Sequence, residues 1–185
     1  MFNEDIIVIE DFFSKSAFND FERILNEPKW QIVNNISAPY NIGMGLQRTV
    51  GDEKESFYLS LYPVHVISKF LDKEYYCVRM RMRAVWPNDN TGSEPHIDEP
   101  EGPENVDASY DISAVVYMND SDGDLIIYDQ IGYVPLPIRR DVQSIRVTPK
   151  RNTCVIMMKK YYHHALWPIN SPMRYCLNIN LKETQ

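Results

Sequence analysis

Cysteine and glycine are scarce in this sequence of 185 residues, which contains three cysteines and seven glycines. The cysteines, Cys77, Cys154 and Cys176, are odd in number, widely spaced and without a C-x-x-C pair, which supports neither a disulfide framework nor a zinc knuckle. Unpaired cysteines suit a reducing compartment, and we therefore expect a cytoplasmic protein. Linkers rich in Gly and Ser and internal repeats are also missing, which favours one domain over residues 1–185.

An excess of positive charge and long apolar runs are missing as well. The net charge is -7, so the average surface repels polyanions, and we do not expect nucleic acid as a partner. No stretch reaches the roughly 18 apolar residues of a membrane span, and the acidic start at residues 1–5 does not resemble a signal peptide. Hydrophobic residues make up 44% of the chain, which is enough for a buried core and predicts a globular protein. Because long apolar runs are missing, we do not expect a membrane as a partner.

The first third of the sequence predicts mixed structure. Residues 6–9 form a short apolar strand candidate, and residues 14–27 have apolar side chains at helical spacing behind Ser14, a good helix cap. A second helix is predicted over residues 56–72, where we expect Pro63 in the first turn because proline is disfavoured in a helix interior. We expect this N-terminal helical support to extend over about residues 1–73.

From residue 74 onward the hydrophobic period changes to two, which is typical of strands. Val78, Met80, Met82 and Ala84 alternate with Arg79, Arg81 and Arg83, which predicts a half-exposed strand whose arginines have a solvated or structural role. Further strands are predicted at short intervals, over residues 110–118, 125–128, 143–148, 153–158, 161–166 and 175–181. The sequence therefore predicts a mainly β fold, a sandwich or jelly roll over about residues 74–185, with the N-terminal helices covering one face.

The triplet His96-Ile97-Asp98 offers two metal ligands on one side of an extended strand. Its first and third side chains point the same way and are about 6.6 Å apart along the backbone, so they can converge on one ion. Two histidines and a carboxylate on one face of Fe(II) leave positions open for a co-substrate and dioxygen. The triplet alone is a weak signal, because a surface histidine bonded to a nearby aspartate has the same pattern.

The C-terminal part of the sequence supplies the third histidine and a distinctive arginine. The run His164-Ala165-Leu166-Trp167-Pro168-Ile169, with Arg174 ten residues after His164, resembles the H-x-V-x-P-V…R signature of the prolyl 4-hydroxylase-like Fe(II)/2-oxoglutarate-dependent oxygenases. Other landmarks of that family appear in the same order, at residues 96–100, 116–119, 123–128 and 147–150. The resemblance covers roughly residues 76–182.

This resemblance implies a double-stranded β-helix core and a set of site residues. It implies iron held by His96, Asp98 and His164, and 2-oxoglutarate held through its C5 carboxylate by Arg174 and by the phenol of Tyr117. Adjacent residues on a strand face opposite ways, so only one of His163 and His164 can point at the metal. The spacing to Pro168 and Arg174 favours His164.

The function implied is that of a dioxygenase that hydroxylates an unactivated C–H bond, first of all in a peptidyl proline or a related amino acid. A same-class oxygenase acting on a small molecule or a nucleobase is an alternative, as is a non-catalytic jelly-roll binding domain. A zinc hydrolase would use the same three ligands but would not need Arg174. His65, in the second predicted helix, is expected to be packed or solvated, and residues 34–55 form either a substrate lid or a surface loop.

Overall fold

The computed structural model describes residues 2–26, 29–34, 44–49, 55–88, 92–98, 110–132, 138–139 and 141–184. The helices are η1 (Phe2–Glu4), α1 (Lys15–Leu25) and α2 (Glu55–Leu71). The strands are β1 (Ile6–Ile9), β2 (Gln31–Asn34), β3 (Met44–Thr49), β4 (Tyr75–Val85), β5 (Ile112–Tyr117), β6 (Leu125–Ile131), β7 (Ser144–Val147), β8 (Thr153–Met157), β9 (Tyr161–Ala165) and β10 (Arg174–Glu183). Among these residues no helix is long and apolar enough to cross a membrane.

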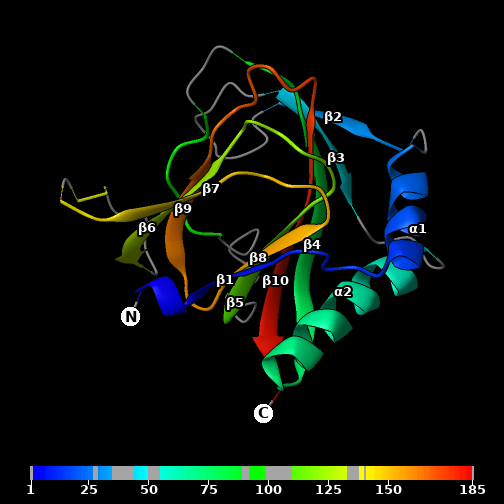
Figure 1. Ribbon diagram of the computed structural model, residues 1–185, viewed down its shortest axis with the longest axis horizontal. Coiled ribbons are helices and arrows are strands. Elements are labelled where there is room, and N and C mark those ends of the chain that lie inside the picture. Colours follow the sequence, from blue (N-terminus) through cyan, green and yellow to red (C-terminus); the bar gives the residue numbers. More distant parts are fainter. Residues whose placement is uncertain are drawn as a thin grey trace.

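The strands form two antiparallel sheets that make the predicted jelly roll (Figure 1). The large sheet has the order β1-β8-β5-β10-β4-β3-β2, and the small sheet has the order β7-β6-β9. β10 pairs with β4 on one side and with β5 on the other, so the last strand of the chain lies in the middle of the large sheet. The prediction of a mainly β fold with a double-stranded β-helix core is confirmed.

Helices α1 and α2 cover the outer face of the large sheet (Figure 1). Ser14 caps α1 as predicted, because its hydroxyl accepts a hydrogen bond from the N–H of Ala17 at 3.4 Å. The expectation for Pro63 was wrong, since this residue lies in the interior of α2. Pro63, Val64 and Ile67 are buried in this helix, and we attribute the continuation of the helix past the proline to this packing.

Strands β2 and β3 were missed by the sequence analysis. They extend the large sheet beyond β4, and with β1 they bring three strands from the N-terminal third into a sheet that we expected to begin near residue 74. β3 pairs with β4, which is far away in the sequence, and β2 pairs with β3 in turn, so both strands depend on a distant partner that no local pattern reveals. Most of the 34–55 segment, considered above as a substrate lid, lies outside the described residues.

A second, smaller apolar cluster fills part of the space between the two sheets. Val115, Val155 and Met157 from the large sheet pack there with Leu125 and Ile127 from the small sheet. Beside this cluster lies a cavity that is lined by charged and polar side chains, such as Arg83 and Asp98, together with apolar ones, such as Val85 and Leu125. The space between the two sheets therefore contains both a packed apolar cluster and a cavity with charged side chains in its lining.

Candidate metal and anion site

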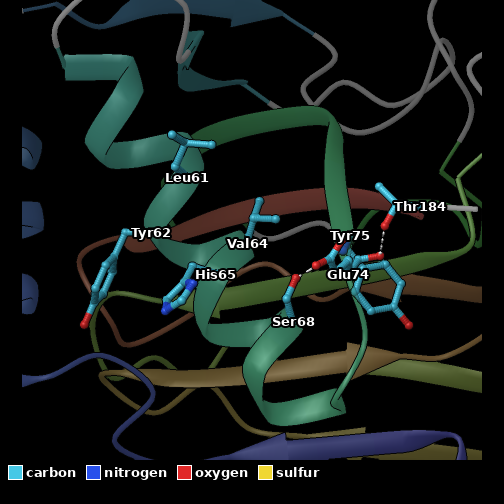
Figure 2. A pocket seen from close by; sticks show the side chains of 8 residues that line it. All are labelled: Leu61, Tyr62, Val64, His65, Ser68, Glu74, Tyr75 and Thr184. Atoms are coloured by element: carbon cyan, nitrogen blue, oxygen red, sulfur yellow. Dashed lines mark hydrogen bonds between the residues drawn. The ribbon is translucent and has the colours of Figure 1, made fainter.

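One hollow of the molecule lies beside α2 (Figure 2). It is an open cavity of about 560 Å³ between α2, the start of β4 and the C-terminal end of the chain. Its lining is mostly apolar, with one imidazole from the exposed His65 and one carboxylate from Glu74. These two groups belong to no cluster of metal-binding side chains among the described residues, so this hollow has no sign of metal chemistry.

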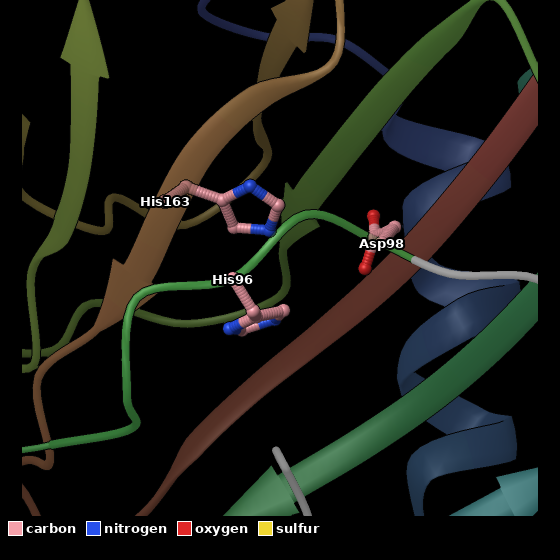
Figure 3. A group of neighbouring side chains, drawn as sticks. All are labelled: His96, Asp98 and His163. Carbon is pink, nitrogen blue, oxygen red and sulfur yellow. The ribbon is translucent and has the colours of Figure 1, made fainter. Parts of the chain in front are cut away.

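A cluster of three side chains that are able to bind a metal lies between the two sheets (Figure 3). His96 and Asp98 come from the extended segment that follows β4, and His163 comes from β9. The ligand atoms of the three side chains all lie within 4.8 Å of one another. The backbones of His96 and His163 form a bridge, with N···O distances of 2.9 Å and 2.8 Å. Residues directly opposite in an antiparallel pair project to the same side, which brings the two rings together.

The sequence analysis predicted His164 in this position, and the structure corrects that assignment. His164 is the next residue on β9 and therefore faces the other side of the strand. Its Nδ1 lies 3.3 Å from the hydroxyl of Tyr128, and the two rings meet edge to face. The spacing to Pro168 and Arg174 pointed to the wrong histidine because the length of the connection from β9 to β10 can vary without changing the site. The bridge to His96, which decides between the two histidines, is a tertiary contact.

The backbone fixes which nitrogen of each ring is free. Nδ1 of His96 lies 2.8 Å from the carbonyl oxygen of Glu94, and Nδ1 of His163 lies 3.0 Å from the carbonyl oxygen of Tyr161. A carbonyl only accepts, so Nδ1 donates in both rings and Nε2 keeps its lone pair. Burial, together with the neighbouring imidazole of His163, lowers the pKa of His96 to about 4, so its ring is neutral at pH 7. Both rings are thus prepared to bind a metal through Nε2.

Three donors hold the carboxylate of Asp98. Ser113 Oγ and Asn180 Nδ2 donate to Oδ2 at 3.1 Å and 2.9 Å, and Arg79 Nη2 lies 3.3 Å from Oδ1. Burial alone raises the pKa of Asp98, but the two imidazoles, the guanidinium and the amide outweigh it, and the net pKa lies below the ordinary value. The carboxyl group is therefore ionised and fixed in direction, as a metal ligand must be.

Arg174 is buried at the start of β10, with 3% of its surface exposed. One of its terminal nitrogens, Nη1, donates to the carbonyl oxygens of Gly123 and Leu166 at 2.6 Å and 2.7 Å. Its Nε is buried without a hydrogen-bond partner, and no carboxylate of the described residues forms an ion pair with it. A buried guanidinium that keeps a free donor is costly unless a ligand supplies the acceptor.

Gly123 allows this arginine to lie where it does. A Cβ at position 123 would come within 2.8 Å of the carbonyl oxygen of Leu166 and 3.0 Å of Nη1 of Arg174. Any larger residue would therefore displace the loop between β5 and β6 from the guanidinium. The Gly123-Asp124 pair, noted as a family landmark, has this physical role in the structure.

Arg174, Tyr117 and the His/Asp/His cluster line one cavity between the sheets. Tyr117 has 2% of its surface exposed, and burial raises the pKa of its phenol above the ordinary value. A protonated phenol can donate a hydrogen bond to an anion in the cavity. The sequence-predicted residues His96, Asp98, Tyr117 and Arg174 are thus brought together, whereas His164 is not.

The arginines of β4 were expected to have a solvated or structural role on a half-exposed strand, and the structure places them between the two sheets. Met82 and Ala84 lie on the face of β4 that the helices cover, where they are buried. The alternate residues Arg79, Arg81 and Arg83 therefore project from the other face, into the space between the sheets. Arg79 contacts Asp98, and Arg83 lines the cavity with a buried Nε that has no hydrogen-bond partner. Alternation alone does not tell which face of a strand meets water, because a polar face can also line a functional cavity.

Comparison with known proteins places the fold. No family model matches the sequence, and no curated protein matches it. Among solved structures, a 2OG-Fe(II) oxygenase family oxidoreductase from Burkholderia pseudomallei superposes with a TM-score of 0.71 at 11% identity, covering 97% of this chain and 85% of that chain. The epimerase SnoN from nogalamycin biosynthesis, described as non-haem and alpha-ketoglutarate-dependent, superposes with a TM-score of 0.69 at 11% identity, covering 96% of this chain and 78% of that chain. A prolyl hydroxylase from Trichoplax adhaerens superposes with a TM-score of 0.64 at 13% identity, covering 97% of this chain and 84% of that chain. The chain shares the fold of these proteins.

Proposed function

We propose that this protein is an Fe(II)- and 2-oxoglutarate-dependent dioxygenase, with the metal held by His96, Asp98 and His163. One observation carries the proposal: a single cavity contains a His/Asp/His cluster and a buried arginine with a free donor. Two imidazoles and a carboxylate on one face are the ligand set of non-haem Fe(II) oxygenases. A simple hydrolase site would have no use for Arg174, and an apolar packing core would exclude it.

The donor set fits such a metal. Both imidazoles keep Nε2 available because Nδ1 donates to the backbone, and Asp98 is ionised. Bound Fe(II) with 2-oxoglutarate would supply dioxygen-dependent oxidation of a C–H bond, coupled to decarboxylation of the co-substrate to succinate. The residues of the chain position the ligands and keep the cavity away from bulk water.

Arg174 and Tyr117 would bind the distal carboxylate of 2-oxoglutarate. A guanidinium gives charge-assisted hydrogen bonds to a carboxylate, and Nε of Arg174 is available for one of them. The phenol of Tyr117, which stays protonated, adds a neutral donor from the neighbouring strand. The anion in turn would compensate the buried positive charge of Arg174.

For the prime substrate, we keep a peptidyl proline or a related amino acid as the first hypothesis. Proteins with this fold have been crystallised with different partners, among them the prolyl hydroxylase with a peptide fragment and HygX with hygromycin B. A small-molecule substrate is therefore the alternative. We also propose that residues 1–185 work as one domain, in the cytoplasm, where the three free cysteines stay reduced.

The test is anaerobic titration of the protein with Fe(II) and then with 2-oxoglutarate. Chelation of the metal by the keto acid should produce a charge-transfer band in the visible spectrum. Arg174→Gln should leave Fe(II) binding intact and weaken 2-oxoglutarate by roughly ten- to a hundredfold, which corresponds to the loss of charge-assisted hydrogen bonds. If the wild-type protein gives no band, or if Arg174→Gln binds 2-oxoglutarate as well as wild type, the proposed function is wrong.

Substrate identity needs a separate measurement. Succinate formation should be followed with a panel of prolyl peptides, free amino acids and larger small molecules, with 2-oxoglutarate alone as the background. Stimulation by a prolyl peptide, with a matched alanyl peptide inactive, would support the first hypothesis. Stimulation only by small molecules would replace it with the alternative.

A further inference from the structure

Arg83 is the cavity-lining cation to which the proposed function assigns no role. It lies on β4 opposite Cys176 of β10, which lies opposite Tyr117 of β5. These three side chains form one row across the large sheet and all line the cavity. Among the described residues that line it, Arg83 and Arg174 are the only arginines, and there is no lysine. The row thus contains one residue already assigned to the co-substrate and one that is not.

The side chain of Arg83 has the same unsatisfied donor as Arg174. Its Nε is closed off from solvent and makes no hydrogen bond within the described part of the chain. Burial lowers the pKa of Arg83; the charges of Cys176 and Asp98 raise it in part, and the positive charges of Arg79 and Arg174 lower it again, so the net pKa lies below the ordinary value. A guanidinium held in this environment remains protonated but lacks a compensating anion beside Nε. The structure therefore has two buried guanidinium edges in one cavity.

The two arginines lie at different depths along the cavity. The inward-facing residues of β10 follow the order Asn180, Asn178, Cys176, Arg174, and Asn180 contacts the metal-binding Asp98. Arg83 is level with Cys176 and is thus one row, about 6.6 Å, nearer to the Asp98 end than Arg174 is. The two carboxylates of a five-carbon diacid are separated by about one such row, so a diacid whose distal carboxylate contacts Arg174 would have its other carboxylate near the level of Arg83.

We propose that Arg83 is a second carboxylate anchor, which binds the carboxylate next to the keto group of 2-oxoglutarate while Arg174 binds the distal one. The inference rests on the proposed function. A carboxylate that gives one oxygen to a metal keeps another oxygen that must be satisfied inside a closed cavity. Nε of Arg83 is an available charged donor at that depth. Arg83 is thus a co-substrate-binding residue that determines preference for a 2-oxo acid.

The test separates the two ends of the co-substrate with two ligands. 2-Oxoglutarate has both carboxylates, whereas 2-oxobutyrate has only the one next to the keto group. Affinities are measured by calorimetry on Mn(II)-loaded protein, in which no turnover is needed, for wild type, Arg83→Gln, Arg83→Lys and Arg174→Gln. Arg81→Gln is the matched control, because Arg81 faces the same side of β4 but does not line the cavity. Thermal melts of each variant establish that it is folded.

Arg83→Gln should weaken both ligands by about ten- to a hundredfold, as expected for loss of a charge-assisted hydrogen bond. Arg174→Gln should weaken 2-oxoglutarate but leave 2-oxobutyrate within about twofold of wild type, because that ligand has no distal carboxylate. Arg83→Lys should recover part of the loss, and Arg81→Gln should change either affinity by no more than about twofold.

Two results would overturn the inference. One is that Arg83→Gln binds both ligands like wild type, and the other is that it weakens 2-oxoglutarate alone, which would put Arg83 at the distal carboxylate. Either result leaves the proposed function standing as long as wild type binds 2-oxoglutarate and Arg174→Gln binds it more weakly. Absence of 2-oxoglutarate binding by wild type would instead remove the proposed function.

Discussion

The two faces of the large sheet differ in chemistry although the same strands build them. The outer face, under α1 and α2, is apolar and includes Met82, Leu177 and Ile179, each fully buried. The inner face has Ser113 and Asn180 at one end and Arg174 at the other. The outer face thus provides hydrophobic stabilisation, and the inner face provides donors and charges for ligands.

This difference teaches that period-two alternation has two meanings in this protein. On a sheet with one wet face, the polar residues of each strand meet solvent. In β4, β5 and β10 they meet a second sheet instead, across a polar cavity. Polar groups enclosed in this way need partners, and Asp98 with its three donors is an example. The variants below should therefore affect stability on one face and ligand binding on the other.

The largest effect is expected for His163→Ala, which removes one of the three proposed metal ligands. Metal affinity should fall on the order of a thousandfold, since each ligand supplies several kcal/mol of binding. His164→Ala is the matched control from the adjacent residue and should retain the metal, because its ring faces Tyr128. Calorimetric titration with Mn(II) measures both. Equal losses in the two variants would contradict the choice of His163.

Leu177→Ala should have the next largest effect, on stability. Leu177 lies in the outer core with none of its surface exposed, and large-to-small substitution at such sites costs about 2–5 kcal/mol. Urea unfolding measures the change in the free energy of unfolding. Metal affinity of the folded fraction at low temperature should stay within about threefold of wild type. A strong loss of metal binding at low urea would show that the two faces are coupled.

Asn180→Ala should have an intermediate effect on metal binding. Its amide donates to Oδ2 of Asp98 at 2.9 Å and also to Ser113 at 3.0 Å. Loss of a group that orients a ligand usually lowers metal affinity by about ten- to a hundredfold. Mn(II) titration checks the prediction, and Asn178→Ala, from the next inward position of β10, is the control. An unchanged affinity would mean that Ser113 and Arg79 suffice to hold the carboxylate.

The smallest effect is expected at the edge where the two sheets meet. Hydrogen bonds from Lys159 and Tyr161 lower the pKa of Asp5. A lowered folded-state pKa means that the stabilisation is present above the unfolded value near 4 and is lost as the pH falls through the folded value. Asp5→Asn should therefore lower stability by about 1 kcal/mol or less at pH 7, because the pair is partly exposed. Thermal melts from pH 3 to pH 7 should show the difference from wild type shrinking towards acid pH.

Much of the fold follows from local patterns. The Ser14 cap, the period-two segments after residue 74 and the turns between them predicted one capped helix and seven strands close to their observed positions. Strands β2 and β3 were not predicted, because short segments become strands only when a partner such as β4 is beside them. The position of Pro63 was also wrong, since packing of α2 decides how far that helix extends.

The site was predicted in part. Asp98 and His96 share a side because of their spacing of two, and Arg174 is notable as an arginine in an apolar strand, so both follow from the sequence. The inward direction of Arg83 does not follow, because alternation gives two faces without saying which one meets solvent. Its free Nε is visible only when the surrounding residues are in place.

The sequence by itself determined which residues alternate after residue 74 and which side chains are able to bind a metal or a carboxylate, because these properties depend on spacing and on side-chain chemistry. Only the tertiary structure decided between His163 and His164, because that choice depends on a backbone bridge to His96 from a distant part of the chain. It also decided that the arginines of β4 face a cavity, since the helices cover the opposite face of the sheet.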